Sequence, residues 1–555
     1  MKLIISLLKD SLGLSIVAVV AGIVAGIGNT LLLGFVNNGL AHRSSDLTGR
    51  LILSFMVLCL VVAGSRFLSQ DLMARFAQRS LRDLRMKLGR RVLSSPLRAQ
   101  EEIGANRILA VFTEDVPAIA GAVIAIPAIC TNLVIVVGCM IYLGMISGKL
   151  LLGVIGFIIF GIITCQVPIA RATRYMNNVR ETNDVLLKQL KAMTEGSKEL
   201  KIHQNRREAF LANLFSSTTL SLQRNNVITN SIFNAVNSWA QTLIFVLMGL
   251  IVFVPYAWTR LEPLQLTAYI LILLFMIGPL LVVMGSIPAF SRAKIALAKL
   301  AELDLSLDKF PAEAEADDTN SATTTWHNLT LSKVKHSYIG EAENSNFVLG
   351  PIDLNLRAGE LVFLTGGNGS GKTTLAKVLT GLYVPEAGEL SFNDQPVTDA
   401  NRDSFRQHFS TVFSDAFIFE TLLGLDKPEL DQEAQDYLAQ FQIDHKVQVK
   451  DGVLSTIDLS QGQRKRLALL TAYLEDRPIY VFDEWAADQD PQFREIFYYQ
   501  LLPGLTARGK TVIVISHDDR YYHVANRIIK LDYGKIAADE FTNRSPIGSE
   551  LAFAI

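Results

Sequence analysis

The sequence predicts two fused domains: an α-helical domain with six membrane spans, followed by a soluble α/β domain that contains a glycine-rich strand–loop–helix segment. Half of the 555 residues are hydrophobic and 19% are charged, below the roughly 25% typical of soluble domains. Residues 1–300 carry 29 Lys and Arg against 14 Asp and Glu, whereas residues 301–555 carry 23 against 39. This asymmetry excludes one uniform soluble fold and predicts that the first half faces lipid.

Six apolar stretches in the first 300 residues are long enough to cross a bilayer, which takes about 20 residues in a helix. Five of them contain no charged residue, and in the second Arg66 sits near the end, where its side chain can reach the interface. A charge at the centre of a span is costly, so the charged segments are expected outside the membrane. The predicted spans are residues 14–36, 51–70, 123–146, 150–167, 232–254 and 266–288.

The Lys and Arg residues indicate which side of the membrane the loops occupy. Segment 71–115 holds nine and segment 170–231 holds ten, while the opposite connections hold few, and such an excess marks cytoplasmic loops. We therefore expect a multi-pass protein whose N-terminus, two long loops and C-terminal half are cytoplasmic. The basic residues alternate with apolar ones at helical spacing (Leu81, Leu84, Leu88), which predicts solvated helix faces rather than a nucleic-acid-binding surface.

An acidic, polar segment separates the two halves. Residues 311–321 read Pro-Ala-Glu-Ala-Glu-Ala-Asp-Asp-Thr-Asn-Ser and contain no large apolar residue, which is typical of a linker. The predicted organisation is a transmembrane domain over residues 1–304, a linker over 305–324 and a soluble domain over 325–555.

An apolar strand at residues 360–365 runs straight into a glycine-rich loop and then a helix. The loop matches the pattern G-x-x-x-x-G-K-[ST] in the strand–loop–helix context that this pattern requires. Its backbone N–H groups can converge on phosphate oxygens, while Lys372 can reach the β- and γ-phosphates of ATP and Thr373 can offer its hydroxyl to Mg²⁺. The residues expected to hold the triphosphate are Gly366, Gly367, Asn368, Gly369, Ser370, Gly371, Lys372, Thr373 and Thr374.

Two further apolar strands lead into side chains that can bind a metal ion or exchange a proton. Residues 479–482 lead into Asp483 and Glu484, and residues 511–515 lead into Ser516 and His517. On its own, an acid pair at a strand end is more often a solvated surface feature. After a phosphate-binding loop, we expect Asp483 to bind Mg²⁺, Glu484 to activate water and His517 to sense the γ-phosphate.

The segment Leu459-Ser460-Gln461-Gly462-Gln463, followed by a helical stretch, resembles the signature of ABC ATPases, with Gln461 in place of a glycine. The resemblance implies that the signature of one subunit closes over the ATP held by the P-loop of another, so that a chain with one of each works as a homodimer. It also implies a catalytic role for Glu484 and a switch role for His517. The further residues that it implies are Tyr338 stacking on adenine, Asp490 in the D-loop, and Ser460, Gly462 and Gln463 contacting ATP in trans.

One departure from the family pattern concerns the metal. Where the family has a glutamine that touches Mg²⁺, this chain reads Thr411-Val-Phe-Ser414-Asp415. The expected metal set is therefore Thr373, Asp483 and Ser414. Because serine is shorter than glutamine, a bridging water or Asp415 is the alternative to direct contact by Ser414.

Several segments resemble a narrower branch, the bacterial half-exporters of cyclic peptides, peptide siderophores and microcins. They are residues 195–201, 366–372, 413–415 and 485–491, and the resemblance extends from the first membrane helix to the end of the chain. It implies ATP-driven export of a peptide-type substrate across the bacterial inner membrane, and it leaves open a periplasmic or outer-membrane export partner. Two alternatives stay open: a siderophore importer built on an exporter fold, and an ATP-gated channel or sensor without steady transport. A gate needs no hydrolytic glutamate, so Glu484 counts against the second alternative.

Polar side chains recur along the fifth predicted span. Asn230, Asn234, Ser238 and Gln241 follow one another at intervals of four, four and three residues, which places them on one face of a helix. Amide groups are costly to expose to lipid, so this stripe is expected to face other helices or a water-filled cavity. Interhelical hydrogen bonding and a cavity wall for an amide-rich peptide are both compatible with the pattern.

Overall fold

The computed structural model describes residues 12–41, 48–253, 263–308, 326–338, 347–425 and 427–542. The chain forms two compact units. The first consists of Met1–Val92 and Glu101–Leu307, and the second of Leu93–Gln100 and Asp308–Ile555. The two units are described separately.

The unit boundaries differ in detail from the predicted domains. The segment Leu93–Gln100 belongs to the second unit, because Arg98 donates a hydrogen bond to Glu386 at 2.6 Å and Leu97 packs against the core of that unit. The first residues of the predicted linker are helical up to Asp308, and residues 309–324 lie outside the described part of the chain.

Long helices make up the first unit. Within the described residues, six segments have the helical length and apolar composition needed to cross a membrane, which confirms the predicted six-span domain. Several of these helices extend far beyond the predicted spans, because the basic segments between the spans continue as helix. The long helices are α2 (Leu12–Ala41), α3 (Thr48–Leu93), α6 (Val116–Ile146), α7 (Gly148–Glu195), α10 (Ser216–Phe253), α12 (Pro263–Gly285) and α13 (Ile287–Asp308).

Short helical segments connect α3 to α6 and α7 to α10. The first connection contains α4 (Leu97–Ile103), α5 (Ala105–Ala110) and the π-helical turn η1 (Val111–Asp115). The second contains α8 (Ser197–Ile202), α9 (Gln204–Ala209) and the π-helical turn η2 (Phe210–Phe215).

The sixth predicted span, residues 266–288, is not one continuous helix. Helix α12 ends at Gly285, Ser286 forms a turn, and α13 begins at Ile287. Pro288 explains the break, because proline has no backbone N–H to donate to the Met284 carbonyl and its ring clashes with the carbonyl four residues earlier. The last residue of the fifth predicted span, Val254, lies outside the described residues.

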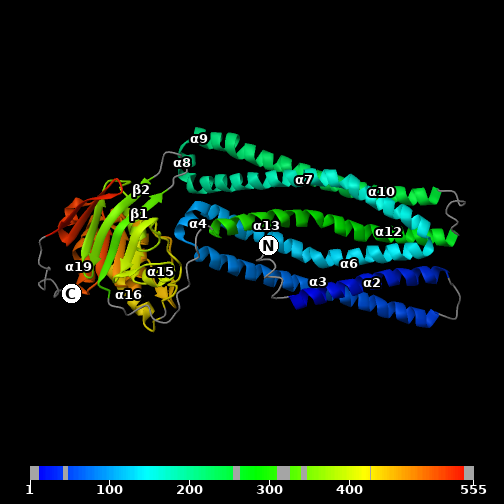
Figure 1. The fold of residues 1–555 in the computed structure, drawn as a ribbon, viewed down its shortest axis with the longest axis horizontal. Coiled ribbons are helices and arrows are strands. Elements are labelled where there is room, and N and C mark those ends of the chain that lie inside the picture. Colours follow the sequence, from blue (N-terminus) through cyan, green and yellow to red (C-terminus); the bar gives the residue numbers. More distant parts are fainter. Residues whose placement is uncertain are drawn as a thin grey trace. The chain divides into compact units, whose positions relative to one another are not determined.

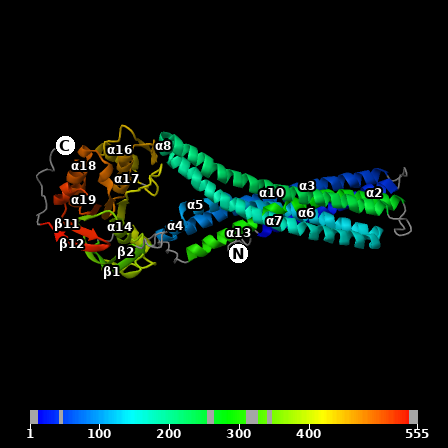
Figure 2. The same cartoon turned by 90° about the horizontal axis from the view of Figure 1, so that it is seen from above.

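The helices of the first unit pack in neighbouring pairs. Helices α7 and α10 run side by side (Figure 1, Figure 2), and α6 contacts both α2 and α12. The α2–α6 contact is close at Gly26, where a Cβ atom would lie 2.8 Å from the Val134 Cβ and 2.9 Å from the Thr131 carbonyl O. Small residues allow such close approach between membrane helices.

Gly26→Ala should lower the thermal unfolding midpoint of the purified protein in detergent, because the added methyl meets the Thr131 carbonyl. Gly34→Ala on the same helix is the matched control, since nothing lies within 4 Å of a Cβ built there. Alanine favours a helix by about 1 kcal/mol over glycine, so this control should be neutral or stabilising. The midpoints can be followed by tryptophan fluorescence, and equal midpoints for the two variants would contradict a close α2–α6 contact.

Two sheets form the framework of the second unit. The larger sheet has the strand order β12-β11-β3-β10-β9-β6, in which only β12 is antiparallel, and the smaller antiparallel sheet has the order β2-β1-β4-β5. The strands of the larger sheet are β3 (Leu361–Gly366), β6 (Phe409–Val412), β9 (Ile479–Asp483), β10 (Thr511–Ile515), β11 (Arg527–Asp532) and β12 (Lys535–Phe541). Those of the smaller sheet are β1 (Asn328–Tyr338), β2 (Phe347–Arg357), β4 (Ala387–Phe392) and β5 (Gln395–Pro396), and a separate hairpin pairs β7 (Val449–Lys450) with β8 (Val453–Leu454).

Both faces of the larger sheet are buried, as expected for parallel strands. Val362 and Leu364 of β3 point into a core shared with α14 and the antiparallel sheet, whereas Phe363 points into the opposite core with α16, α17 and α19. The helices and helical turns of this unit are α14 (Lys372–Leu379), α15 (Arg402–Arg406), α16 (Leu430–Gln440), α17 (Gln461–Glu475), η3 (Trp485–Asp488), α18 (Pro491–Ile496), η4 (Phe497–Leu501), α19 (Leu502–Ala507) and η5 (Asp519–Val524).

The carboxyl ends of the parallel strands meet at one edge of the larger sheet. Ile515, the last residue of β10, pairs with Leu364 of β3 on one side and with Asp483 of β9 on the other. The glycine-rich loop, Glu484 and the Ser516-His517 segment therefore follow three adjacent strands. Parallel α/β sheets bind ligands at this kind of edge.

Candidate nucleotide site

The glycine-rich loop between β3 and α14 requires a residue without a side chain at its start. Gly366 has a φ of 140°, and a Cβ there would lie 2.2 Å from the carbonyl O of Leu531 on β11. The loop then passes directly into α14, whose first residue is Lys372. The free N–H groups and the dipole of a helix N-terminus attract anions such as phosphate, so this arrangement suits a bound triphosphate.

Lys372 is buried, and its Nζ donates hydrogen bonds to two carbonyls of its own loop. The distances are 3.1 Å to the Gly366 O and 2.9 Å to the Gly367 O. Burial lowers the pKa of Lys372, and the carboxylates of Glu484 and Asp483 oppose this shift. Charged phosphate oxygens are stronger acceptors for an ammonium group than neutral carbonyls. A bound triphosphate can therefore take over the hydrogen bonds that Lys372 makes within the loop.

Asp483 is fully buried at the end of β9, and its two carboxylate oxygens differ in their contacts. Oδ2 accepts a hydrogen bond from the Thr373 hydroxyl at 3.0 Å, whereas Oδ1 has no hydrogen-bond partner among the described residues. Burial raises the pKa of Asp483, and the hydrogen bond from Thr373 acts against this rise. A buried oxygen without a partner is unusual and calls for an explanation such as a bound ion.

The oxygens of Asp483 and Thr373 fit Mg²⁺, which prefers oxygen ligands and is usually held by one or two carboxylates together with substrate phosphates. When bound, Mg²⁺ neutralises charge on the β- and γ-phosphate oxygens. Ser414, the third predicted ligand, lies exposed in the turn after β6. The carboxylates of Glu484 and of Asp415, the residue after Ser414, also raise the pKa of Asp483, so two further negative charges act on this site.

Glu484 and His517 come together although they follow different strands. His517 Nε2 lies 3.1 Å from Glu484 Oε1, and both side chains are partly exposed. The backbone of Glu484 is left-handed, with a φ of 49°, and its N–H donates to the Ile515 carbonyl at 3.1 Å. A carboxylate and an imidazole in this contact can orient a water molecule next to a phosphate.

The signature segment forms the beginning of α17. Ser460 is the N-cap: its hydroxyl accepts from the Gln463 N–H at 3.4 Å, and the Gln463 side chain accepts from the Ser460 N–H at 3.3 Å. Ser460 and Gln461 are exposed. The reciprocal cap holds this helix end in a defined conformation while it faces outward.

The D-loop, which comprises residues 487–490, is joined to α17 by three side chains that were not among the predicted site residues. Gln489 donates to the Gly462 carbonyl at 3.0 Å and accepts from Arg466 at 2.9 Å. Lys465 contacts Asp488 at 2.7 Å and donates to the Glu484 carbonyl at 2.9 Å. The available signal was the run Arg464-Lys465-Arg466, which leads directly into the apolar part of the predicted helix.

The remaining predicted residues of this unit lie at two places. Asp490 caps α18 by accepting from the Phe493 N–H at 2.9 Å, which lowers the pKa of Asp490, and it also forms an ion pair with Arg466. Tyr338 ends β1 opposite Phe347, and its side chain lies outside the part of the chain that the structure describes.

A second candidate site lies in the first unit, in a cavity of about 570 Å³ between α6, α7, α10 and the α12–α13 break. Asn230 and Asn234 of the predicted stripe line this cavity, whereas Ser238 and Gln241 lie exposed farther along α10. Sequence reasoning missed the other polar lining residues, which are Glu114, Arg180, Asn183, Asn226, Thr229, Asn237 and Arg292.

Both parts of the chain match known families. Residues 12–280 match the ABC transporter transmembrane region, and residues 349–487 match the ABC transporter family. The chain belongs to the ABC transporters: it is an exporter-type half-transporter with six membrane helices and an ATP-binding domain, and thus an ATPase coupled to transport.

The chain is 33% identical to the ATP-binding protein SyrD of Pseudomonas syringae pv. syringae, over 95% of this chain and 94% of SyrD. It is 27% identical to the pediocin PA-1 transport/processing ATP-binding protein PedD of Pediococcus acidilactici, over 49% of this chain and 38% of PedD. It is 32% identical to the ATP-dependent lipid A-core flippase of Alkalilimnicola ehrlichii, over 35% of each chain. The fold is similar to that of a bacterial Atm1-family ABC exporter with ATP bound, with a TM-score of 0.75 at 18% identity over 96% of this chain and 95% of that one.

Asp483→Asn should stabilise the protein while it removes Mg²⁺-dependent hydrolysis. Burial disfavours the ionised carboxylate, so at neutral pH the charge destabilises the folded state, and asparagine keeps the contact with Thr373 without the charge. We expect a higher unfolding midpoint without Mg²⁺ or nucleotide, by roughly 2–4 °C for each kcal/mol gained. The gain should shrink as the pH falls through the raised folded-state pKa, because Asp483 itself then becomes protonated.

Differential scanning fluorimetry across pH measures the stability change, and phosphate release measures hydrolysis, which should fall by roughly 100-fold or more. A midpoint below that of the wild type at neutral pH would show that the Asp483 charge is stabilising and would contradict this prediction.

Proposed function

We propose that this protein exports a peptide-type substrate, such as a cyclic peptide, a peptide siderophore or a microcin, across the bacterial inner membrane as an ATP-driven homodimer. The basic segments 71–115 and 170–231 support a cytoplasmic position for the long loops, the N-terminus and the ATPase domain. Hydrolysis uses ATP and Mg²⁺ at the edge of the larger sheet, with Glu484 activating water and His517 contacting the γ-phosphate.

The observation that carries the substrate class is the amide-rich cavity beside α10. Its five asparagine side chains can each donate and accept hydrogen bonds, as the backbone of a peptide does. An apolar cavity of about 330 Å³ adjoins it and shares Ile169, Met284 and Ile287 with it. A peptide that presents both backbone amides and apolar side chains fits a wall of this mixed kind.

The similar proteins support the same class. The similarity to SyrD extends over almost the whole of both chains, while the similarity to the lipid A-core flippase covers about a third of each. PedD is named for transport and processing of pediocin PA-1. By analogy, a secreted peptide is a better candidate substrate than a lipid.

The exposed start of α17 supports a composite ATP site made by two chains. Gln461 donates a hydrogen bond to Asp488, and the Gly462 carbonyl accepts one from Gln489, so both residues contact the D-loop of the same chain. Ser460 forms an exposed helix cap. In a homodimer, this helix N-terminus closes over the γ-phosphate held by the partner's P-loop, which is a favourable position for an anion. ATP binding would join the two ATPase domains, and hydrolysis would release them.

Glu484→Gln should leave ATP binding intact and stop turnover, because the P-loop supplies the phosphate contacts while the carboxylate acts on water. We expect hydrolysis to fall by roughly 100- to 10,000-fold, and the variant to retain ATP as a dimer on gel filtration in detergent. Phosphate release and the amount of bound nucleotide per chain provide the measurement. Near-normal hydrolysis in this variant would remove Glu484 from the catalytic role.

Asn234→Ala should reduce export by about 2- to 10-fold, which corresponds to the loss of one hydrogen bond to the substrate. Gln241→Ala is the matched control, because Gln241 lies on the same helix outside the cavity. A deletion strain of the source bacterium is complemented with each variant, and peptides in the cells and in the medium are compared by mass spectrometry. Equal effects of the two variants would favour a structural role for α10, and accumulation of lipids in place of peptides would contradict the proposed substrate class.

A further inference from the structure

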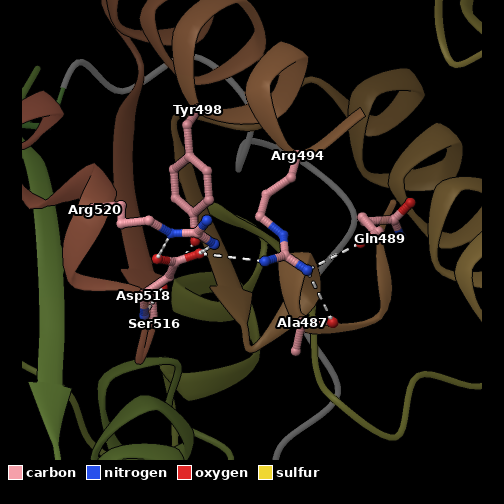
Figure 3. A network of polar contacts seen from close by, with 7 residues as sticks. All are labelled: Ala487, Gln489, Arg494, Tyr498, Ser516, Asp518 and Arg520. Atoms are coloured by element: carbon pink, nitrogen blue, oxygen red, sulfur yellow. Dashed lines mark hydrogen bonds and ion pairs between the residues drawn. The ribbon is translucent and has the colours of Figure 1, made fainter. Parts of the chain in front are cut away.

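Arg494 lies on α18 directly after the D-loop, and its guanidinium contacts two separate segments of the chain (Figure 3). Nη2 donates to the Gln489 carbonyl at 3.0 Å and to the Ala487 carbonyl at 3.4 Å. Nη1 donates to the carboxylate of Asp518 at 3.4 Å. One side chain thus joins the segment that follows Glu484 to the residue that follows His517.

Asp518 is itself held by other groups. Arg520 donates two hydrogen bonds to its carboxylate, at 2.8 Å and 2.7 Å, and the Asp518 N–H donates to the Ser516 hydroxyl at 3.1 Å. The hydrogen bond from Arg520 lowers the pKa of Asp518, so this carboxylate is ionised at neutral pH. It therefore provides Arg494 with a fixed negative partner.

Arg494 also borders the space next to the predicted catalytic pair. A cavity of about 290 Å³ is bounded by Arg494 together with Glu484, Ala487, Ser516 and His517. The Nε of Arg494 is buried and has no hydrogen-bond partner among the described residues. Burying a donor without an acceptor costs stability, so stability alone is a poor explanation for an arginine at this position.

We propose that Arg494 is a positioning residue for the Glu484–His517 pair, an inference that rests on the roles proposed above for these two residues. Glu484 and His517 follow neighbouring strands, β9 and β10, whose paired residues end at Asp483 and Ile515, and the Glu484 N–H adds one backbone hydrogen bond to the Ile515 carbonyl. Arg494 makes a further connection between the two segments, through the D-loop backbone on one side and Asp518 on the other. A misplacement of about 1 Å in a catalytic group can cost roughly 100-fold in rate.

Three variants separate this role from a structural one. Arg494→Ala should lower kcat by roughly 10- to 100-fold and leave the KM for ATP near the wild-type value, because the P-loop contacts do not involve Arg494. Arg494→Lys keeps a cation that cannot reach all three acceptors at once, so it should recover part of kcat. Glu495→Ala is the matched control: Glu495 is the next residue of α18, is exposed and does not border the cavity, so this variant should stay within about twofold of the wild type.

The experiment measures kcat, KM and the thermal unfolding midpoint of the purified full-length protein with Mg²⁺ and ATP, with Glu484→Gln in the same series. A lower kcat for Arg494→Ala at unchanged KM and midpoint, with partial recovery in Arg494→Lys, supports the proposal. If Arg494→Ala does not fold, an intermediate kcat for Arg494→Lys at wild-type KM supports it, and an unaltered kcat overturns it.

Two failures are distinguishable in this series. If Glu484→Gln hydrolyses ATP at a near-normal rate, the proposed catalytic role of Glu484 fails. If Glu484→Gln is inactive while Arg494→Ala keeps its kcat, or loses it only together with its unfolding midpoint, the positioning role of Arg494 is overturned and the catalytic assignment stands.

Discussion

Parallel pairing of β3, β9 and β10 is the constraint on which the ATP site depends. These strands are buried on both faces, so their register is fixed by packing, and their carboxyl ends meet at one edge. Lys372, Asp483 and His517 each belong to a different segment of the chain and reach the same place only because of this pairing. Burial raises the pKa of the Asp483 carboxylate, and carboxylates with a shifted pKa are common at binding and catalytic sites.

The signature segment and the D-loop contact each other through side chains from both segments. Gln461, which replaces a glycine, donates to the Asp488 carboxylate at 3.1 Å, and Gln489 donates to the Gly462 carbonyl. Gln461, which departs from the signature pattern, and Gln489 therefore both connect the two segments. Together with Lys465 and Arg466, they bind the start of α17 and the D-loop into one block, so the two motifs are expected to move together.

The sequence predicted what depends on neighbouring residues in the chain. The membrane spans, the glycine-rich loop and the acids after β9 are each encoded in a continuous run, so pattern and composition were sufficient. Gln489 and Arg494 were missed because their partners lie 27 and 24 residues away and depend on tertiary packing. The polar stripe on α10 predicted the cavity only in part. Helical spacing places Asn234 and Gln241 on one face, but the extent of the cavity depends on the neighbouring helices, and only Asn234 of these two residues lines it.

The break between α12 and α13 has a consequence for the wall of the cavity. Pro288 has no N–H, so the Met284 carbonyl has no helical donor four residues later, and both residues line the cavity. The proline therefore removes a helical hydrogen bond at the point where the two helices border the cavity. Because this interruption depends on the ring of Pro288 and not on the side chain of Met284, the other lining side chains of the two helices can diverge in evolution while the interruption itself is retained.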